Sequence, residues 1–146
     1  MILPVQFSKE MLTHTASQYP RMDTGLLEKV LRALQLLESL VLTDVPFIFK
    51  GGTAAMLLSS VPHRFSIDID ILLDEPGHLE AHFESICRSN GFTRYVRQNR
   101  PERGGLRKDH YKFLYDSVVS GAAEQPVLLD VVYQDNPYPE LQDTPI

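Results

Sequence analysis

The chain has 146 residues, of which 43% are hydrophobic and 23% are charged, with one cysteine and a formal net charge of −5. These values are typical of one globular domain, and they exclude a mainly disordered, collagen-like or coiled-coil chain. A single cysteine allows no intrachain disulfide and no cysteine-based zinc site, which favours a reducing, cytoplasmic compartment. No apolar run is long enough to cross a membrane, and no signal peptide is visible.

Two helices are expected in the first part of the chain, with a third possible near residues 8–16. Leucines and valines at helical spacing predict an amphipathic helix over residues 24–43, with Asp23 as its N-cap. Thr53 is expected to cap a second helix that runs to Leu58, directly after a glycine pair. These helices supply apolar surfaces that need a sheet or further helices to cover them.

The rest of the chain is rich in strand patterns. The alternating run Ser-Ile-Asp-Ile-Asp-Ile-Leu-Leu is the clearest of them, and a further helix is expected between residues 74 and 91. We predict strands at residues 47–49, 66–73, 92–98, 109–119 and 127–133. The order of elements predicts an α/β or α+β fold with a mixed sheet.

The charges are unevenly distributed along the chain. Residues 94–112, called here the basic segment, hold seven basic and two acidic residues, which gives a local charge of +5. The segment is either a hairpin with charges turned to solvent or a surface that binds the phosphates of a polynucleotide. Under the second interpretation the acceptor-binding residues are Arg94, Arg97, Arg100 and Arg103.

Two aspartates stand out because they share one face of a strand. Asp68 and Asp70 are two residues apart in an alternating run, so their carboxylates leave the same side of it. Such a pair needs a counter-charge, a proton or a divalent cation, and oxygen ligands suit Mg²⁺ or Mn²⁺. An isolated Asp-x-Asp is more often simply turned to solvent.

Two further features accompany this pair. The run Lys50-Gly51-Gly52-Thr53 lies between a strand and a helix, where glycines allow close approach and the helix N-terminus favours phosphate. Such turns are common, and a structural role is the alternative. Asp130 stands alone in an apolar strand, where a charge needs a partner, a hydrogen bond or a metal.

Taken together, the phosphate turn, the paired carboxylates and the later carboxylate resemble the DNA polymerase beta-like nucleotidyltransferase superfamily. The local strings are most similar to the AbiEii-type nucleotidyltransferase toxins of bacterial toxin–antitoxin and phage-defence systems. These strings are Phe49-Lys50-Gly51-Gly52-Thr53-Ala54 and Arg64-Phe65-Ser66-Ile67-Asp68-Ile69-Asp70. The resemblance covers about residues 24 to 134, and it implies the polymerase beta-like fold, a mixed sheet with helices packed on one face.

The resemblance also implies an activity and a set of site residues. The expected reaction moves NMP from an NTP to an acceptor, which is an RNA such as tRNA or a protein side chain. Asp68, Asp70 and Asp130 would be the catalytic and Mg²⁺-binding carboxylates. The nucleotide-binding residues would be Lys50, Gly51, Gly52, Thr53 and, by its position in a strand, Lys112. A cognate antitoxin protein is the partner that the family implies.

Two other functions fit the same sequence: a catalytically silent relative that binds a partner, and a nucleotidyltransferase acting on a small molecule. We expect residues 1–146 to form one nucleotidyltransferase domain with an N-terminal segment at 1–22. Family members usually continue into a helical C-terminal region, so residues 135–146 are interpreted as a tail or as the start of that region.

Overall fold

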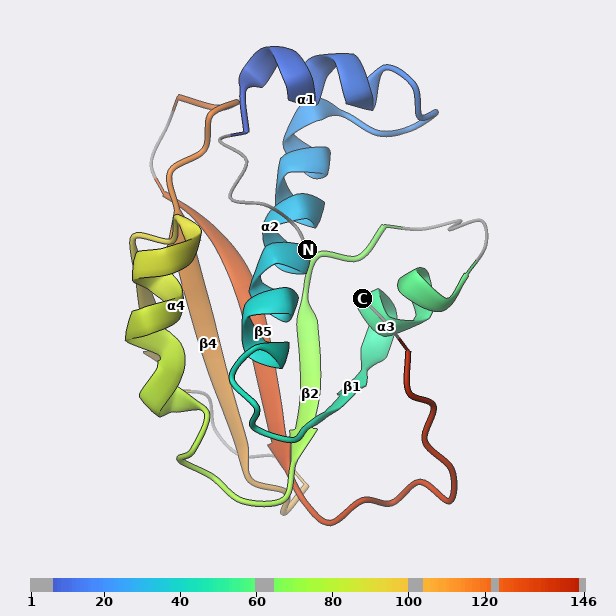
Figure 1. The fold of residues 1–146 in the computed structure, drawn as a ribbon, viewed down its shortest axis with the longest axis vertical. Helices are drawn as coiled ribbons and strands as arrows, with labels where there is room; N and C mark the ends of the chain where they lie inside the picture. Colours follow the sequence, from blue (N-terminus) through green and yellow to red (C-terminus); the bar gives the residue numbers. More distant parts are fainter. Residues whose placement is uncertain (1–6, 60–64, 100–103, 122–123, 145–146) are drawn as a thin grey trace.

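The computed structural model describes residues 7–59, 65–99, 104–121 and 124–144 (Figure 1). Its helices are α1 (Lys9–Ala16), α2 (Thr24–Val41), α3 (Gly51–Leu58), the short 3₁₀ helix η1 (Glu80–His82) and α4 (Phe83–Asn90). Its strands are β1 (Ile48–Lys50), β2 (Ile69–Leu73), β3 (Arg94–Gln98), β4 (Lys108–Tyr115) and β5 (Gln125–Tyr133). The predicted mixture of helices and strands is therefore confirmed.

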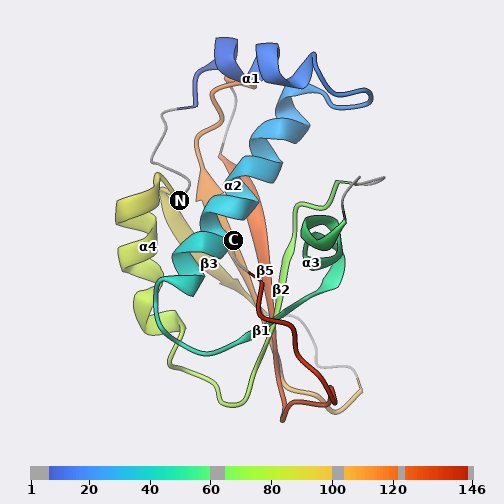
Figure 2. The same cartoon turned by 45° about the vertical axis from the view of Figure 1, so that its right-hand side comes forward.

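The five strands form one sheet in the order β1-β2-β5-β4-β3. Strands β2 and β5 are parallel, whereas the other three neighbouring pairs are antiparallel, so the predicted mixed sheet is also confirmed. Figures 1 and 2 show α2 and α4 covering one face of this sheet, while α3 flanks its β1–β2 edge. We call the face turned away from α2 and α4 the outer face.

Alternation along the strands determines which side chains enter the core. Every second residue of β2 and β5 is apolar and buried against the helices: Ile69, Ile71, Leu73, Val127, Leu129 and Val131. Successive side chains of a strand point to opposite faces, so the residues between them belong to the outer face. Asp70 and Asp130 are two of these, which places both carboxylates on the outer face.

Side-chain caps start the first two helices as the sequence indicates. Ser8 Oγ accepts a hydrogen bond from the backbone N–H of Met11 at 3.1 Å, and Asp23 Oδ1 accepts one from Leu26 at 2.8 Å. Helix α1 packs across the N-terminal part of α2 in a small separate apolar cluster (Figure 1). The predicted N-cap at Asp23 is thus confirmed.

Two expectations about helix starts were wrong. Helix α3 begins at Gly51, so Thr53 lies inside its first turn and does not cap it. No helix begins at residue 74, because the chain bends through Gly77, whose φ of +101° is a turn conformation, and becomes helical only at η1. The strands expected at 66–73 and 109–119 are shorter than expected, as β2 and β4, respectively.

Candidate active site

Four polar side chains lie in a single row across the outer face. Lys50 of β1 is paired in register with Asp70 of β2, and Asp70 is paired with Asp130 of β5. Asp130 in turn is paired with His110 of β4. Directly opposed residues of neighbouring strands have Cβ atoms about 5 Å apart on the same face. The sheet therefore brings together two carboxylates and two basic groups from segments up to 80 residues apart in the chain.

The Asp70 carboxylate lies against the backbone of Gly51. A Cβ placed on Gly51 would lie 2.9 Å from Asp70 Cγ, closer than real Cβ contacts allow. Gly51 also has a φ of +81°, a conformation that side chains other than glycine rarely adopt. The glycine is therefore required both for the turn and for the approach of Asp70 to the start of α3.

The pKa of Asp70 is raised above the usual aspartate value, chiefly because the carboxyl is partly buried. The ammonium of Lys50 opposes this effect, whereas the neighbouring charges of Asp130 and Asp68 add to it. A carboxylate that lies near two others is repelled by them, so a nearby positive charge stabilises its ionised form. The ammonium of Lys50, on the adjacent strand, supplies part of this positive charge.

Asp68 lies one residue before β2 and is fixed through its backbone. Thr53 is fully buried, and its Oγ1 donates a hydrogen bond to the carbonyl oxygen of Asp68 at 2.6 Å. A second close approach lies next to it, because a Cβ on Gly52 would be 2.9 Å from Ser66 Oγ. The first turn of α3 and the segment that carries Asp68 are thus held directly against each other.

The three aspartates do not form a closed ligand set in this structure. Within the described ranges, no three His, Cys, Asp or Glu side chains gather in a group able to hold a metal ion. Like charges repel, and Asp130 Oδ1 is engaged by His110 Nδ1 at 2.6 Å. The donor chemistry nevertheless fits a hard divalent cation, because Asp70 and Asp130 offer carboxylate oxygens in adjacent register positions.

His110 is the residue of this row that the sequence did not reveal. The histidines are scattered along the chain, and none forms a recognisable motif with an aspartate. The only available signal was the alternation in β4, which puts His110 on the same strand face as Lys112. Its contact with Asp130 depends on the register in which β4 and β5 pair, and this register cannot be predicted from either segment alone.

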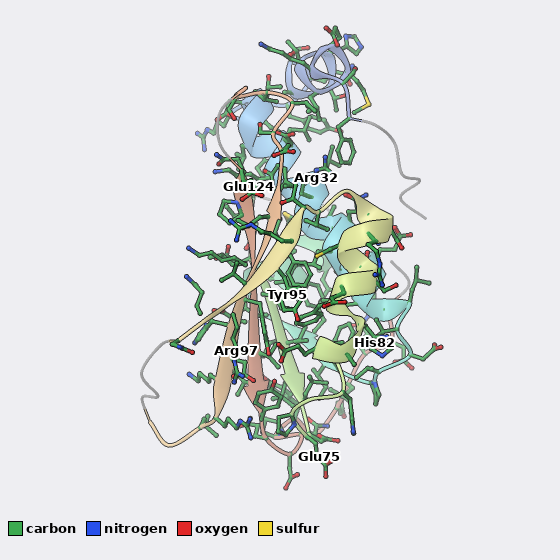
Figure 3. The ribbon with its side chains drawn as sticks, turned by 90° about the vertical axis from the view of Figure 1, so that its left-hand side faces the viewer. Arg32, Glu75, His82, Tyr95, Arg97 and Glu124 are labelled. Atoms are coloured by element: carbon green, nitrogen blue, oxygen red, sulfur yellow. The ribbon has the colours of Figure 1, made fainter. Side chains whose placement is uncertain are left out.

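Two of the four arginines proposed for acceptor binding are engaged in ion pairs. Arg94 binds the half-buried Glu124 at 2.9 Å, and Arg97 binds Asp109 at 2.5 Å. Arg97 pairs in register with the buried Tyr111, so it lies on the helix-covered face, opposite to Asp70 (Figure 3). Arg100 and Arg103 lie outside the described residues.

Lysines of β4 lie on the outer face instead. Lys108 and Lys112 flank His110 at two residues' distance, and they pair with Val132 and Leu128 of β5. Seen from the side, nitrogen-tipped side chains extend from the face turned away from the helices (Figure 3). Of the predicted nucleotide-binding residues, Lys112 therefore shares a face with the two carboxylates, although it is not their direct neighbour.

The five-stranded mixed sheet with its helices has a nucleotidyltransferase-type fold. The family model "Nucleotidyl transferase AbiEii toxin, Type IV TA system" matches residues 32–146. The chain belongs to this family. No curated protein matches the sequence significantly.

Two solved structures from Helicobacter pylori resemble the chain. One is described as a "putative nucleotidyltransferase", with 25% identity and a TM-score of 0.56 over 77% of this chain and 48% of its own. The other, JHP933, has 25% identity and a TM-score of 0.55 over 77% and 47%. The chain therefore spans about half the length of these proteins. Among the described residues, no helix is long and apolar enough to cross a membrane.

Proposed function

We propose that the protein transfers a nucleoside monophosphate from an NTP to a hydroxyl of a polymeric acceptor, as the toxin of a toxin–antitoxin system. The observation that carries this proposal is the direct pairing of Asp70 with Asp130 beside the Gly51 turn. It puts two carboxylates next to a helix N-terminus that can accept phosphate. The family description supports the toxin role and, with it, a cognate antitoxin as partner.

The carboxylates have distinct roles in this proposal. Asp68 and Asp70 would hold the divalent metal together with Asp130, and Asp130 would also accept the proton of the attacking hydroxyl. Mg²⁺ or Mn²⁺, when bound, would supply Lewis-acid stabilisation of the charge that develops at phosphorus. In the reaction, the acceptor oxygen forms a bond to the α-phosphorus, and the bond to the pyrophosphate group breaks.

The junction of β1 and α3, at Gly51 and Gly52, is proposed to hold the triphosphate. Helix α3 begins with Gly51 and Gly52, and the side chain of its N-cap residue, Lys50, makes no capping hydrogen bond, so a phosphate can reach its first N–H groups. Lys50 stands beside Asp70 at the same end, and Lys112 approaches from β4 on the outer face. Thr53 contributes by tying this turn to Asp68.

Incubation with each labelled NTP, Mg²⁺ and either total RNA or total protein tests the proposed function. We expect label to be incorporated into one polymeric fraction, and mass spectrometry of that fraction identifies the acceptor. Incorporation into neither fraction, with Mg²⁺ or with Mn²⁺, would contradict the proposal. Transfer to a small molecule alone would favour the small-molecule alternative. NTP binding without any transfer would favour the catalytically silent relative.

The substitution Gly52→Val tests the phosphate turn. A valine Cβ would already meet Ser66 Oγ at 2.9 Å, and its branched methyl groups would crowd the approach to α3. We expect the Kd for NTP with Mg²⁺ to rise by about tenfold or more, which is about 1.4 kcal/mol. Calorimetry on the folded variant measures this. Unchanged affinity would mean that the turn is only structural.

The basic segment is proposed to position a nucleic-acid acceptor through its phosphates. Ion pairs with Glu124 and Asp109 already engage Arg94 and Arg97, and an arginine that binds a phosphate releases a counterion. Replacing Arg100 and Arg103 by alanine is therefore expected to weaken RNA binding and flatten its salt dependence by roughly 1.5 units. Filter binding at several salt concentrations measures the slope.

The matched control for this experiment is the double variant Arg94→Ala/Arg97→Ala. It removes the same formal charge, but it also leaves Glu124 and Asp109 without their arginine partners, so a smaller change in the salt slope is expected. If both pairs of substitutions leave RNA affinity and slope as they are, the basic segment is a solvated hairpin. The acceptor must then be sought among proteins or small molecules.

A further inference from the structure

The contact between His110 and Asp130 joins two strands at the centre of the candidate site. The two residues are directly opposed in the antiparallel pairing of β4 with β5, and Nδ1 lies 2.6 Å from Oδ1. An ionised carboxylate only accepts hydrogen bonds, so Nδ1 carries the hydrogen of this bond. A bond of this length to a charged oxygen is among the stronger hydrogen bonds in proteins.

The surroundings make His110 the side chain that can hold Asp130. Among the described residues, the structure records one hydrogen bond to the Asp130 carboxylate, and it comes from His110. The imidazole side chain is only 15% exposed, whereas the Asp130 side chain is 34% exposed. A largely enclosed ring thus orients a carboxylate that solvent could otherwise reach and reorient.

The contact also has a consequence for Asp70. Asp130 faces His110 on one side and Asp70 on the other, within the same row across three strands. The two carboxylates repel, so without a second anchor Asp130 would rotate away from Asp70. Groups that bind a metal or a substrate depend on such second contacts for their orientation.

We propose that His110 is a positioning residue, which holds the Asp130 carboxylate beside Asp70 through the hydrogen bond from Nδ1. This inference rests on the proposed nucleotidyl transfer and assigns a role within it to a residue outside the aspartate motif. The role requires an N–H at the place of Nδ1, not a charge or the bulk of an imidazole. Replacements of similar size should therefore differ in activity according to whether they place an N–H at this position.

Three substitutions at one position separate positioning from simple packing. Asparagine places its amide N–H where Nδ1 stands, glutamine extends its amide one bond farther, and leucine has no donor. For His110→Leu we expect the Kd for Mn²⁺ to rise and kcat to fall, each by about 10- to 100-fold. The KM for NTP is expected to change far less, because the nucleotide is held by the turn before α3.

The relative effects of the three His110 substitutions distinguish a positioning role from simple packing. His110→Asn is expected to recover Mn²⁺ affinity and kcat to near the wild-type values, whereas His110→Gln resembles His110→Leu. His82→Leu is the matched control, because His82 lies on the helix-covered side of the sheet (Figure 3), and it should change neither quantity. Thermal midpoints of all variants identify any loss of folding.

Two outcomes overturn the inference. In one, His110→Leu keeps the wild-type Mn²⁺ affinity and kcat. In the other, His110→Asn is as impaired as His110→Leu although both are equally stable. A failure of the proposed function gives a different result, because wild type itself would then transfer no nucleotide to any acceptor and would not differ from Asp70→Ala. That result would contradict both the proposed nucleotidyl transfer and the positioning role of His110.

Discussion

The substitution Asp70→Asn is expected to lower nucleotidyl transfer by at least about a thousandfold, equal to about 4 kcal/mol in the barrier. Asparagine keeps the volume that lies against Gly51 but removes the charge and one ligand oxygen. Asp70 is the carboxylate that lies between Lys50 and Asp130 and against Gly51, so no other residue of the row can replace it. Steady-state transfer of labelled nucleotide measures the loss.

The same substitution should not destabilise the fold. Burial raises the pKa of Asp70 in the folded protein, so the folded state holds this proton to higher pH than the unfolded state does. Stability contributed by the group is therefore lost as pH rises through the raised pKa, and at pH 7 the ionised carboxylate is a cost. Asparagine removes that cost, and the thermal midpoint at pH 7 should be equal to wild type or a few degrees higher.

Asp74→Asn is the matched control for this experiment. Asp74 is exposed directly after β2, so losing its charge should alter neither transfer nor stability. An Asp70→Asn variant that keeps wild-type transfer would remove Asp70 from the site. A variant that is inactive because it has unfolded would contradict the electrostatic argument, since this predicts an inactive protein with an intact fold.

Local patterns were enough to predict the carboxylate strand and its orientation. The alternation of aspartate and isoleucine placed Asp70 on the face opposite to the core, and the structure has it there. Asp23 as a helix cap was also visible in the sequence. Such features depend on residues a few positions apart, where side-chain spacing and backbone geometry are directly linked.

Pairing between distant strands was not predictable in the same way. The row across β1, β2, β5 and β4 depends on register, and a shift of one residue would turn Asp130 to the other face. The face that Arg97 occupies follows from the alternation of its strand, which its charge alone does not indicate. Tyr95, two residues earlier, packs against the core, so Arg97 had to share that face.

The substitution Gly51→Ala is expected to impair transfer by about a hundredfold or more and to destabilise the protein. Alanine pays about 1 kcal/mol or more at a φ of +81°, and its Cβ would meet Asp70 Cγ at 2.9 Å. Asp70 must then move away from α3 and from its place beside Asp130. Transfer assays and denaturant unfolding of the same preparation measure both effects.

Gly104→Ala separates the two causes, because Gly104 has a φ of +80° and no atom of the described residues lies within 4 Å of the position of its Cβ. This control should show only the backbone cost, and transfer should remain at the wild-type rate. The excess destabilisation of Gly51→Ala over Gly104→Ala then reports the crowding of Asp70, and it should shrink by about 1 kcal/mol in an Asp70→Ala background. Equal costs for both glycines, together with wild-type transfer in Gly51→Ala, would show that Asp70 does not need its contact with the turn.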